Sequence, residues 1–443
     1  MKLTELQGIL RENGIVGAGG AGFPTYAKLS EKADTIILNC AECEPLLKLH
    51  RQVLETHPRE IFEALDLISK TVNAKKVYIA LKKSYKKTAA AIEPFTEFFK
   101  NIEIFRLNDV YPAGDEVILT YEVTGRVVPP GNIPLSVGVT VLNVETVYNA
   151  YKALNGIPVT HKYVTVAGEV ENPITVCVPL GVTVGEVLKT AGNITTPDPA
   201  FIIGGPMMGV LGSPANIVTK TTNAVLVLPS EHQLIKKRQA KPFMDMKRAM
   251  AACCQCSYCT SLCSRNLLGQ PINPSEFMRV ASNGITNVAA PYIDSLYCSG
   301  CGLCEEYSCG QGLSPRTLLS ACKAELRKAG IKPERFEQSP TPRPERPLRQ
   351  VPMSRLTSRI GLNSYNKPAP LTECELHFNK VTLLLSQHIG APSVPTVKKG
   401  DKVSLNAQIA ASPDGLGVAL HSSVDGTVTA VGKTAIIIET DKG

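Results

Sequence analysis

Two groups of closely spaced cysteines constrain this chain more than any other feature. Nine of the 14 cysteines lie between residues 253 and 309. Within each group, three cysteines stand at two-residue gaps and a fourth follows after three or four intervening residues. Three cysteines at this spacing bind three corners of a cubane, and a fourth completes the ligand set. The sequence therefore predicts two [4Fe–4S] clusters, with the metal ligands Cys253, Cys256, Cys259, Cys263, Cys298, Cys301, Cys304 and Cys309.

The spacing leaves some points of ligation open. Zinc sites usually take cysteines in pairs, so a run of three favours an iron–sulfur cluster over zinc. Cys254 stands beside Cys253 and either thiol could be the first ligand, although the gap to Cys256 favours Cys253. The fourth cysteine of each group can close its own cluster or cross to the other one, as in two-cluster ferredoxins. Serine follows Cys263 and glycine follows Cys309, where ferredoxins have proline.

Composition and the N-terminus argue against several classes of protein. A chain of 443 residues corresponds to roughly three domains of about 150 residues. No apolar run reaches the length of about 18 residues that a transmembrane helix needs, and Glu5 interrupts the stretch where a signal peptide would be apolar. We therefore expect a cytoplasmic protein. A net charge of +8 is mild for this length, and the chain has no tryptophan, so nucleic acid is not an expected partner.

Local patterns divide the chain into five segments. The first has strand-like runs at 35–39 and 76–81 and an amphipathic helix at 57–72, which is typical of an α/β domain. Short strands with one helix come next, followed by the cysteine-rich segment. A stretch dense in proline and arginine then predicts an extended, solvated linker, and short strands separated by glycine and aspartate end the chain. The predicted boundaries are 1–155, 160–235, 245–330, 331–375 and 376–443.

The stretch 14–25 is too rich in glycine for packing alone. Glycine lets the backbone approach a phosphate closely and present its N–H groups to it. No Gly-Lys-Ser/Thr follows, so the stretch is not a Walker loop. No strand clearly precedes it, so it is not a standard dinucleotide-binding fingerprint either.

Four ordered motifs between Gly14 and Thr146 resemble the flavin mononucleotide (FMN) site of a known family. That family contains the flavoprotein subunit of respiratory complex I and the C subunit of the Rnf ferredoxin:NAD oxidoreductase. The motifs are the glycine loop, the acidic segment 39–45, the Tyr-x-x-Gly-acid-Glu segment 111–116 and the Asn-Val-Glu-Thr segment 143–146. The resemblance implies FMN as a cofactor and NADH as its reductant. Ala18 and Ala41 replace an arginine and an acid of the complex I branch.

The same resemblance implies a role for each matched residue. The glycines would shape the contact with the phosphate and ribityl chain, and Lys28 would pair with the phosphate. Glu42 and Glu116, the expected catalytic carboxylates, would lie where the nicotinamide nucleotide stacks on the flavin. The residues expected to hold the flavin are Gly17, Gly19, Gly20, Gly22, Lys28, Asn39, Glu42, Tyr111, Gly114, Asp115, Asn143 and Thr146.

The middle and the tail of the chain resemble further modules of these proteins. Residues 160–230 resemble a soluble-ligand-binding β-grasp domain marked by the Gly-Gly-Pro-Met-Met-Gly loop at 204–209. This loop could bind a ligand, but a tight turn that packs domains together is the favoured interpretation. Residues 384–430 resemble a barrel-sandwich hybrid of the biotinyl/lipoyl type. Their 413–417 turn has no lysine, so we expect neither biotin nor lipoate, and His421 is expected to be structural.

These resemblances together predict a multidomain α/β and α+β protein. It would combine a flavin-binding α/β domain, a β-grasp domain, a helical two-cluster ferredoxin-like domain and a C-terminal β barrel-sandwich module. In the Rnf C subunit the barrel-sandwich module comes first, whereas here it comes last. That order, together with the segment 351–356, resembles the cobalamin reductases of propanediol-utilization microcompartments.

This resemblance covers nearly the whole chain and implies a function. The protein would pass electrons from NADH through FMN and two [4Fe–4S] clusters to cobalamin. Its partners would then be NADH, cobalamin or a cobalamin-handling enzyme such as an adenosyltransferase, and the shell of the bacterial microcompartment that encloses it. Two alternatives remain: an electron-transfer subunit with a protein acceptor, Rnf-C-like or linked to an amino-acid reductase, and a non-enzymatic scaffold with structural clusters.

Overall fold

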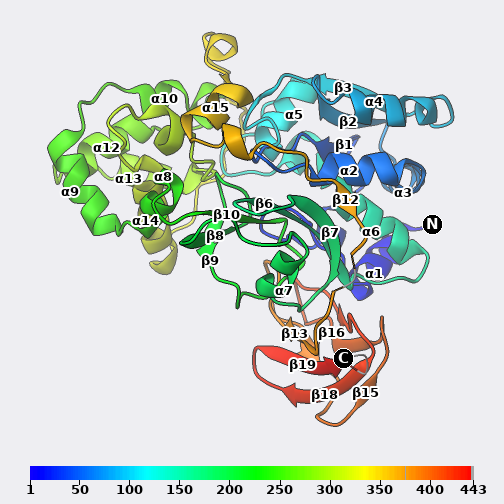
Figure 1. The fold of residues 1–443 in the computed structure, drawn as a ribbon. Coiled ribbons are helices and arrows are strands. Elements are labelled where there is room, and N and C mark those ends of the chain that lie inside the picture. Colours follow the sequence, from blue (N-terminus) through cyan, green and yellow to red (C-terminus); the bar gives the residue numbers. More distant parts are fainter. Residues whose placement is uncertain (375, 441–443) are drawn as a thin grey trace.

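The computed structural model describes residues 1–374 and 376–440. Its N-terminal part contains a four-stranded parallel sheet in the order β3-β2-β1-β5 (Figure 1). The strands are β1 (Thr35–Cys40), β2 (Lys76–Lys82), β3 (Ile102–Leu107) and β5 (Val139–Asn143). Apolar residues run almost continuously through β1, which is expected of a strand that is buried on both faces. The strand runs and the helix predicted for this part of the sequence therefore form.

Helices cover both faces of this parallel sheet. On one face pack α1 (Leu3–Glu12), α2 (Leu49–Thr56), α3 (Pro58–Val72), α4 (Lys86–Ile92) and α6 (Val144–Leu154). Helix α5 (Glu116–Thr124) packs on the other face against Ile37 and Val141. The chain leaves β1 in one direction and β5 lies on its other side, so the carboxyl ends of β1 and β5 flank a topological switch point. Ligands bind at such points in open α/β sheets.

The second domain is a six-stranded sheet in the order β12-β7-β6-β10-β8-β9. Its strands are β6 (His161–Gly168), β7 (Ile174–Pro179), β8 (Pro199–Ile203), β9 (Val210–Gly212), β10 (Ala224–Pro229) and the late β12 (Leu371–Thr372). One helix, α7 (Val184–Lys189), begins with a capping box between Thr183 and Glu186. The expectation of a small β-rich domain with one helix agrees with this arrangement.

The cysteine-rich domain is helical and lies beside the first two domains (Figure 1). A small core of Phe277, Met278, Leu318 and Leu319 holds it together. Cys304 begins a π-helix, Cys304–Ser308, and the 3₁₀ turn Asp294–Tyr297 precedes Cys298. The helices of this part are α8 (Gln233–Gln239), α9 (Pro242–Ala252), α10 (Tyr258–Ser261), α11 (Ser264–Leu267), α12 (Pro274–Ser282), α13 (Ala290–Ile293) and α14 (Pro315–Lys328).

Residues 331–374 of the expected linker combine a mostly exposed proline-rich stretch with two short strands that pair with neighbouring sheets. Strand β11 (Val351–Pro352) pairs with β4 (Val110–Tyr111) of the first domain, and β12 pairs with β7 of the second. Between them, α15 (Met353–Arg359) lies against the cysteine-rich domain (Figure 1). Arg346 is buried and forms an ion pair with Glu122. Most of the proline-rich stretch 331–345 is exposed, as expected of a solvated linker, whereas the short later strands Val351–Pro352 and Leu371–Thr372 pair with sheet edges.

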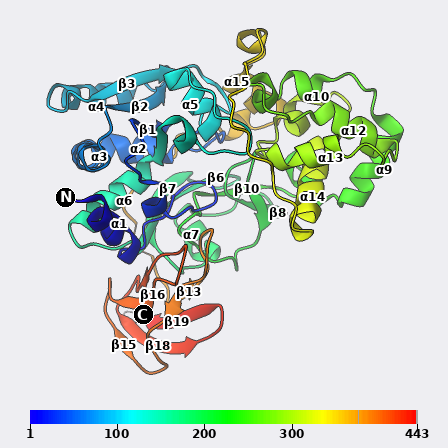
Figure 2. The ribbon, with the colours of Figure 1, turned by 180° about the vertical axis from the view of Figure 1, so that it is seen from behind.

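The C-terminal module consists of two small sheets that dock onto α1 and the β-grasp domain (Figure 2). Arg11 of α1 donates to the carbonyl oxygens of Pro413 and Gly415, and the Tyr26 hydroxyl donates to Gly415 at 3.2 Å. The 413–417 turn therefore packs against the first domain. The strands are β13 (Lys380–Leu384), β14 (Val394–Pro395), β15 (Lys402–Val403), β16 (Gln408–Ala411), β17 (Leu420–His421), β18 (Gly426–Val431) and β19 (Ala435–Thr440).

In residues 1–374 and 376–440, no helix has both the length and the hydropathy that crossing a bilayer requires.

Candidate cofactor sites

The glycine loop forms a closed turn over the switch point of the parallel sheet. Val16 and Pro24 form an antiparallel bridge, and the Gly17 N–H donates to the Phe23 carbonyl at 2.9 Å. The Ala18 N–H donates to the Thr146 hydroxyl at 2.9 Å, which ties the loop to the start of α6.

The turn leaves a run of backbone donors free. Gly20 and Gly22 both have φ near +70°, a region that favours glycine. Within the described residues, the N–H groups from Gly19 to Gly22 donate to no protein acceptor. Successive free N–H groups of this kind form an anion-binding nest. The donor set therefore fits a phosphate such as that of FMN.

We expect Gly20→Val to lower the affinity for FMN by about tenfold or more, because the side chain enters the space above the nest. A Cβ at Gly20 meets no protein atom within 4 Å, so the change should not disturb packing. Gly156 is a matched control, since its φ is +76° and a Cβ there also meets nothing within 4 Å. Both variants carry the same type of backbone strain. Equal FMN affinity of the two variants, measured by fluorescence titration of the apoprotein, would remove the loop from the flavin site.

Two asparagines lie opposite each other at the carboxyl ends of β1 and β5. Asn39 and Asn143 are register partners in the sheet. Asn39 donates through Nδ2 to the Gly114 carbonyl at 2.9 Å. Asn143 caps α6 and places Nδ2 3.0 Å from the Nε2 atom of His50. A Cβ at Gly19 would lie 3.2 Å from Asn143 Nδ2, so the glycine loop and both strand ends meet here.

Lys28 and Glu116, expected at the phosphate and at the nucleotide, form an ion pair with each other. The Lys28 ammonium lies 2.6 Å from the Glu116 carboxylate. The Glu116 side chain is 46% exposed, and Glu116 is the first residue of α5. A carboxylate in this position is open to a ligand that approaches from water.

Glu42, the other expected catalytic carboxylate, is almost completely buried. Its Oε1 accepts the His50 N–H at 2.7 Å, and Arg51 lies 3.6 Å from its Oε2. Burial raises the pKa of Glu42 to about 7, although Arg51 and the backbone donors oppose this shift. The structure therefore places Glu42 as an anchor between the acidic segment and the start of α2. The expected contact of this carboxylate with a nucleotide stays a prediction.

Tyr111 and Asp115, expected to line the flavin, contact the cysteine-rich domain. The Tyr111 hydroxyl donates to the carbonyl oxygen of Cys301. Asp115 caps α5 and also accepts from Arg265, at 3.1 Å from Nε and 2.9 Å from Nη2. Arg265 was not singled out by the sequence patterns, because its partner lies 150 residues away. One short segment thus joins the end of the parallel sheet to the cysteines.

The eight expected metal ligands surround two separate cavities. Cys253, Cys256, Cys259 and Cys309 line a cavity of about 220 Å³. Burial, together with the nearby thiols of Cys256, Cys309 and Cys253, raises the pKa of Cys259 to about 12. The exposed Cys254 lines the same cavity. The fourth cysteine of the second group therefore lies with the first group.

At the second cavity, the fourth cysteine of the first group lies with the second group. Cys263 joins Cys298, Cys301 and Cys304 around a narrower space of about 20 Å³. Burial raises the pKa of Cys301 to about 12, with the nearby Cys263 thiol as the next cause. Pro112 of the first domain also lines this space, so the space faces the parallel-sheet domain. In residues 1–374 and 376–440, no three His, Cys, Asp or Glu side chains converge enough to bind one metal ion.

The thiols around each cavity fit a cubane cluster, although they come from both sequence groups. Each cavity presents four thiols from two stretches of chain, which is the ligand set of a [4Fe–4S] cluster in a two-cluster ferredoxin. The sequence left open which cysteine closes which cluster, and the cavity linings support crossing.

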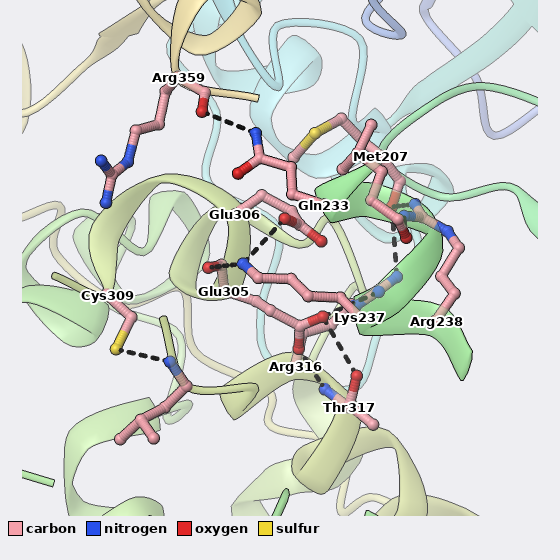
Figure 3. Close-up of polar contacts among 12 residues, drawn as sticks. Met207, Gln233, Lys237, Arg238, Glu305, Glu306, Cys309, Arg316, Thr317 and Arg359 are labelled. Atoms are coloured by element: carbon pink, nitrogen blue, oxygen red, sulfur yellow. Dashed lines mark hydrogen bonds and ion pairs between the residues drawn. The ribbon is translucent and has the colours of Figure 1, made fainter. Parts of the chain in front are cut away.

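The 204–209 loop lies where three domains meet. The Glu44 carboxylate accepts the N–H groups of Met207 at 2.7 Å and Met208 at 2.9 Å. From the other side, Arg316 donates to the Met207 carbonyl at 3.2 Å (Figure 3). Arg238 donates to the Pro206 carbonyl. A Cβ at Gly205 would lie 2.2 Å from Glu44, so only glycine fits. These contacts agree with the favoured interpretation, a turn that packs domains.

Buried ion pairs hold the π-helix that carries Cys304. Arg316 lies 3.1 Å from Glu305, and Lys237 of α8 lies 3.0 Å from Glu306 (Figure 3). The Thr317 N–H also donates to Glu305 at 2.8 Å. Removing one partner of a buried pair leaves an uncompensated charge. These pairs therefore fix the π-helix against α8 and α14.

Family models match four parts of the chain. The Nuo51 FMN-binding domain matches residues 10–152, and the SLBB domain matches residues 163–211. The 4Fe-4S dicluster domain matches residues 252–314, and the RnfC barrel sandwich hybrid domain matches residues 364–442. The fold and sites thus define a multidomain α/β protein with a flavin-binding domain and an iron–sulfur dicluster domain.

Curated relatives span nearly the whole chain. "Cobalamin reductase PduS" of Salmonella typhimurium is 40% identical over 442 residues, which is 99% of this chain and 97% of the relative. The protein of the same name from Citrobacter freundii is 39% identical over 97% of this chain and 95% of its own length. This chain belongs to the PduS cobalamin reductase family.

More distant similarities agree with the domain content. The C subunit of the Na(+)-translocating ferredoxin:NAD(+) oxidoreductase complex of Acetobacterium woodii is 34% identical over 60% of this chain and 58% of its own length. A solved NAD+-reducing [NiFe]-hydrogenase matches with a TM-score of 0.50 and 19% identity, over 76% of this chain and 64% of that one. The hydrogenase supports the fold alone.

Proposed function

We propose that this protein is an NADH-dependent oxidoreductase that passes electrons through FMN and two [4Fe–4S] clusters to cobalamin. Membership of the PduS family over nearly the full length carries the proposal. Each NADH provides electrons for two one-electron reductions of cob(III)alamin to cob(II)alamin, with release of NAD+ and a proton. Bound FMN supplies the change from two-electron to one-electron chemistry, and bound clusters carry single electrons.

The residues around the switch point would hold the flavin. The free N–H groups from Gly19 to Gly22 would bind its phosphate, and Lys28 would add a positive charge. Asn39 and Asn143 would offer polar contacts at the strand ends. Glu116, exposed and paired with Lys28, is the better placed of the two carboxylates to contact NADH.

The order of carriers follows from the domain contacts. The cavity of Cys263, Cys298, Cys301 and Cys304 would hold the cluster nearer to the flavin, because Tyr111 and Asp115 contact its walls. The cavity of Cys253, Cys256, Cys259 and Cys309 would hold the outer cluster, and electrons would leave from there.

The predicted boundaries at 1–155, 160–235, 245–330 and 376–443 are proposed as the functional modules. The segment 331–375 is proposed as a brace between them, in view of its pairing with β4 and β7. A location inside a propanediol-utilization microcompartment, with its shell and an adenosyltransferase as partners, is proposed from the family name alone.

An anaerobic assay of electron acceptors tests the function. We expect NADH to drive reduction of hydroxocobalamin by the holoprotein, followed by the absorbance of cob(II)alamin. Ferredoxin in place of cobalamin tests the alternative of an Rnf-like subunit with a protein acceptor, which the Acetobacterium similarity keeps open. Reduction of ferredoxin without any reduction of cobalamin would contradict the proposal. A protein that binds no FMN would instead favour the scaffold.

A further inference from the structure

An open cleft of about 820 Å³ lies between α15 and the cysteine-rich domain. Its cysteine-domain wall includes Tyr258 of α10, Tyr307 of the π-helix and Gly310. The opposite wall includes Arg355 and Arg359 of α15. The electron path from the flavin to the two cysteine cavities uses neither α15 nor this cleft.

Two arginines on α15 provide unpaired positive charge. Leu356 and Ile360 bury one face of the helix, whereas Arg355 and Arg359 are exposed and stand one helical turn apart. Among the described residues neither guanidinium has an ion-pair partner. Figure 3 shows the Arg359 guanidinium extended away from the buried contacts, while its carbonyl oxygen accepts from Gln233 at 3.1 Å. No aspartate or glutamate lines the cleft.

The cleft adjoins the cavity proposed for the outer cluster. Tyr258 and Gly310 line both the cleft and the cavity of Cys253, Cys256, Cys259 and Cys309. Tyr258 lies between Cys256 and Cys259 in the chain, and Gly310 follows Cys309. A molecule bound in the cleft would therefore stand next to the outer cluster. Since electron transfer needs donor and acceptor to be close, this position suits the final acceptor.

We propose that this cleft binds cobalamin, and the proposal rests on the function proposed above. Cobalamin is a large ligand with one phosphodiester in its nucleotide tail and amide groups around its corrin ring. The paired arginines fit the phosphodiester, because guanidinium groups bind phosphate through two parallel hydrogen bonds. The tyrosines offer apolar rings for the corrin face and hydroxyls for the amides. The cleft volume is at the upper end of the range for ligand sites, about 300–1,000 Å³.

Direct binding to the oxidised holoprotein tests the cleft without turnover. We expect Arg355→Ala/Arg359→Ala to weaken binding of hydroxocobalamin by at least about tenfold in equilibrium dialysis, because it removes both charged donors. Arg279→Ala/Arg327→Ala is the matched control, since it removes two exposed arginines of the cysteine-rich domain outside the cleft. The control should bind as the wild type does. Iron content and flavin reduction by NADH should be unchanged in both.

The possible results distinguish failure of the cleft proposal from failure of the proposed cobalamin reductase activity. If the wild type reduces cobalamin and the α15 double variant binds it as tightly as the control does, the cleft is not the site. If the variant loses only reduction of a partner protein, the cleft serves a protein acceptor and the proposal is overturned. If the wild type reduces no cobalamin under NADH, the proposed function fails first, and the cleft proposal falls with it.

Discussion

Cys309→Ser and Cys256→Ser should remove the same four-iron cluster, although the two residues belong to different sequence groups. Both thiols line the outer cavity, so each variant loses one ligand of one cluster. Iron should fall from about eight to about four atoms per chain in both variants. Their electron paramagnetic resonance spectra after reduction should be identical and should show only the inner cluster.

The complementary pair gives the control for this result. Cys263→Ser and Cys301→Ser should both show only the signal of the outer cluster, because both residues line the inner cavity. Cys177→Ser, on the exposed side of β7, should keep all the iron. A Cys309→Ser spectrum that matches Cys301→Ser would show that each sequence group closes its own cluster. Zinc instead of iron after anaerobic purification would end the cluster interpretation.

The cysteine spacing predicts iron–sulfur ligands but leaves open which four thiols lie together, and the cavity linings group them across the two sequence groups. Ligation within a group depends on local spacing, whereas crossing depends on how the helices from α10 to α14 bring two distant loops together. The same limit applies to the contacts that join the domains. Glu44 meets the 204–209 loop across 163 residues, and Arg265 meets Asp115 across 150. No local pattern marks such pairs.

The burial of Glu42 and the pairing of strands β11 and β12 have a related cause. A carboxylate in an acidic loop segment is equally consistent with ligand binding and with anchoring a helix, and only burial separates the two. Likewise, proline-rich composition predicts extended backbone but not whether a sheet edge is available to pair with it. The periodic helices and the buried strands, by contrast, depend on short-range patterns and were predictable.

Two further variants should affect different steps of the electron path. If the inner cluster connects the flavin to the outer cluster, Cys301→Ser should slow reduction of cobalamin by about a hundredfold or more and leave flavin reduction by NADH unchanged. Glu116→Gln should instead slow the first step, the reduction of flavin by NADH, and with it the NADH-driven reduction of cobalamin. It removes the exposed carboxylate at the expected nucleotide position, so flavin reduction should slow by about tenfold, while dithionite should still reduce the clusters at the normal rate.

One measurement tests the path itself most directly. The holoprotein and Cys301→Ser are each mixed rapidly with NADH and hydroxocobalamin without oxygen, and flavin bleaching and cob(II)alamin formation are followed separately. A path through the inner cluster predicts equal flavin bleaching in both proteins and strongly delayed cob(II)alamin formation in Cys301→Ser alone. Cob(II)alamin formation at the wild-type rate in that variant would contradict this path, because electrons would then reach cobalamin from the reduced flavin without passing the inner cluster.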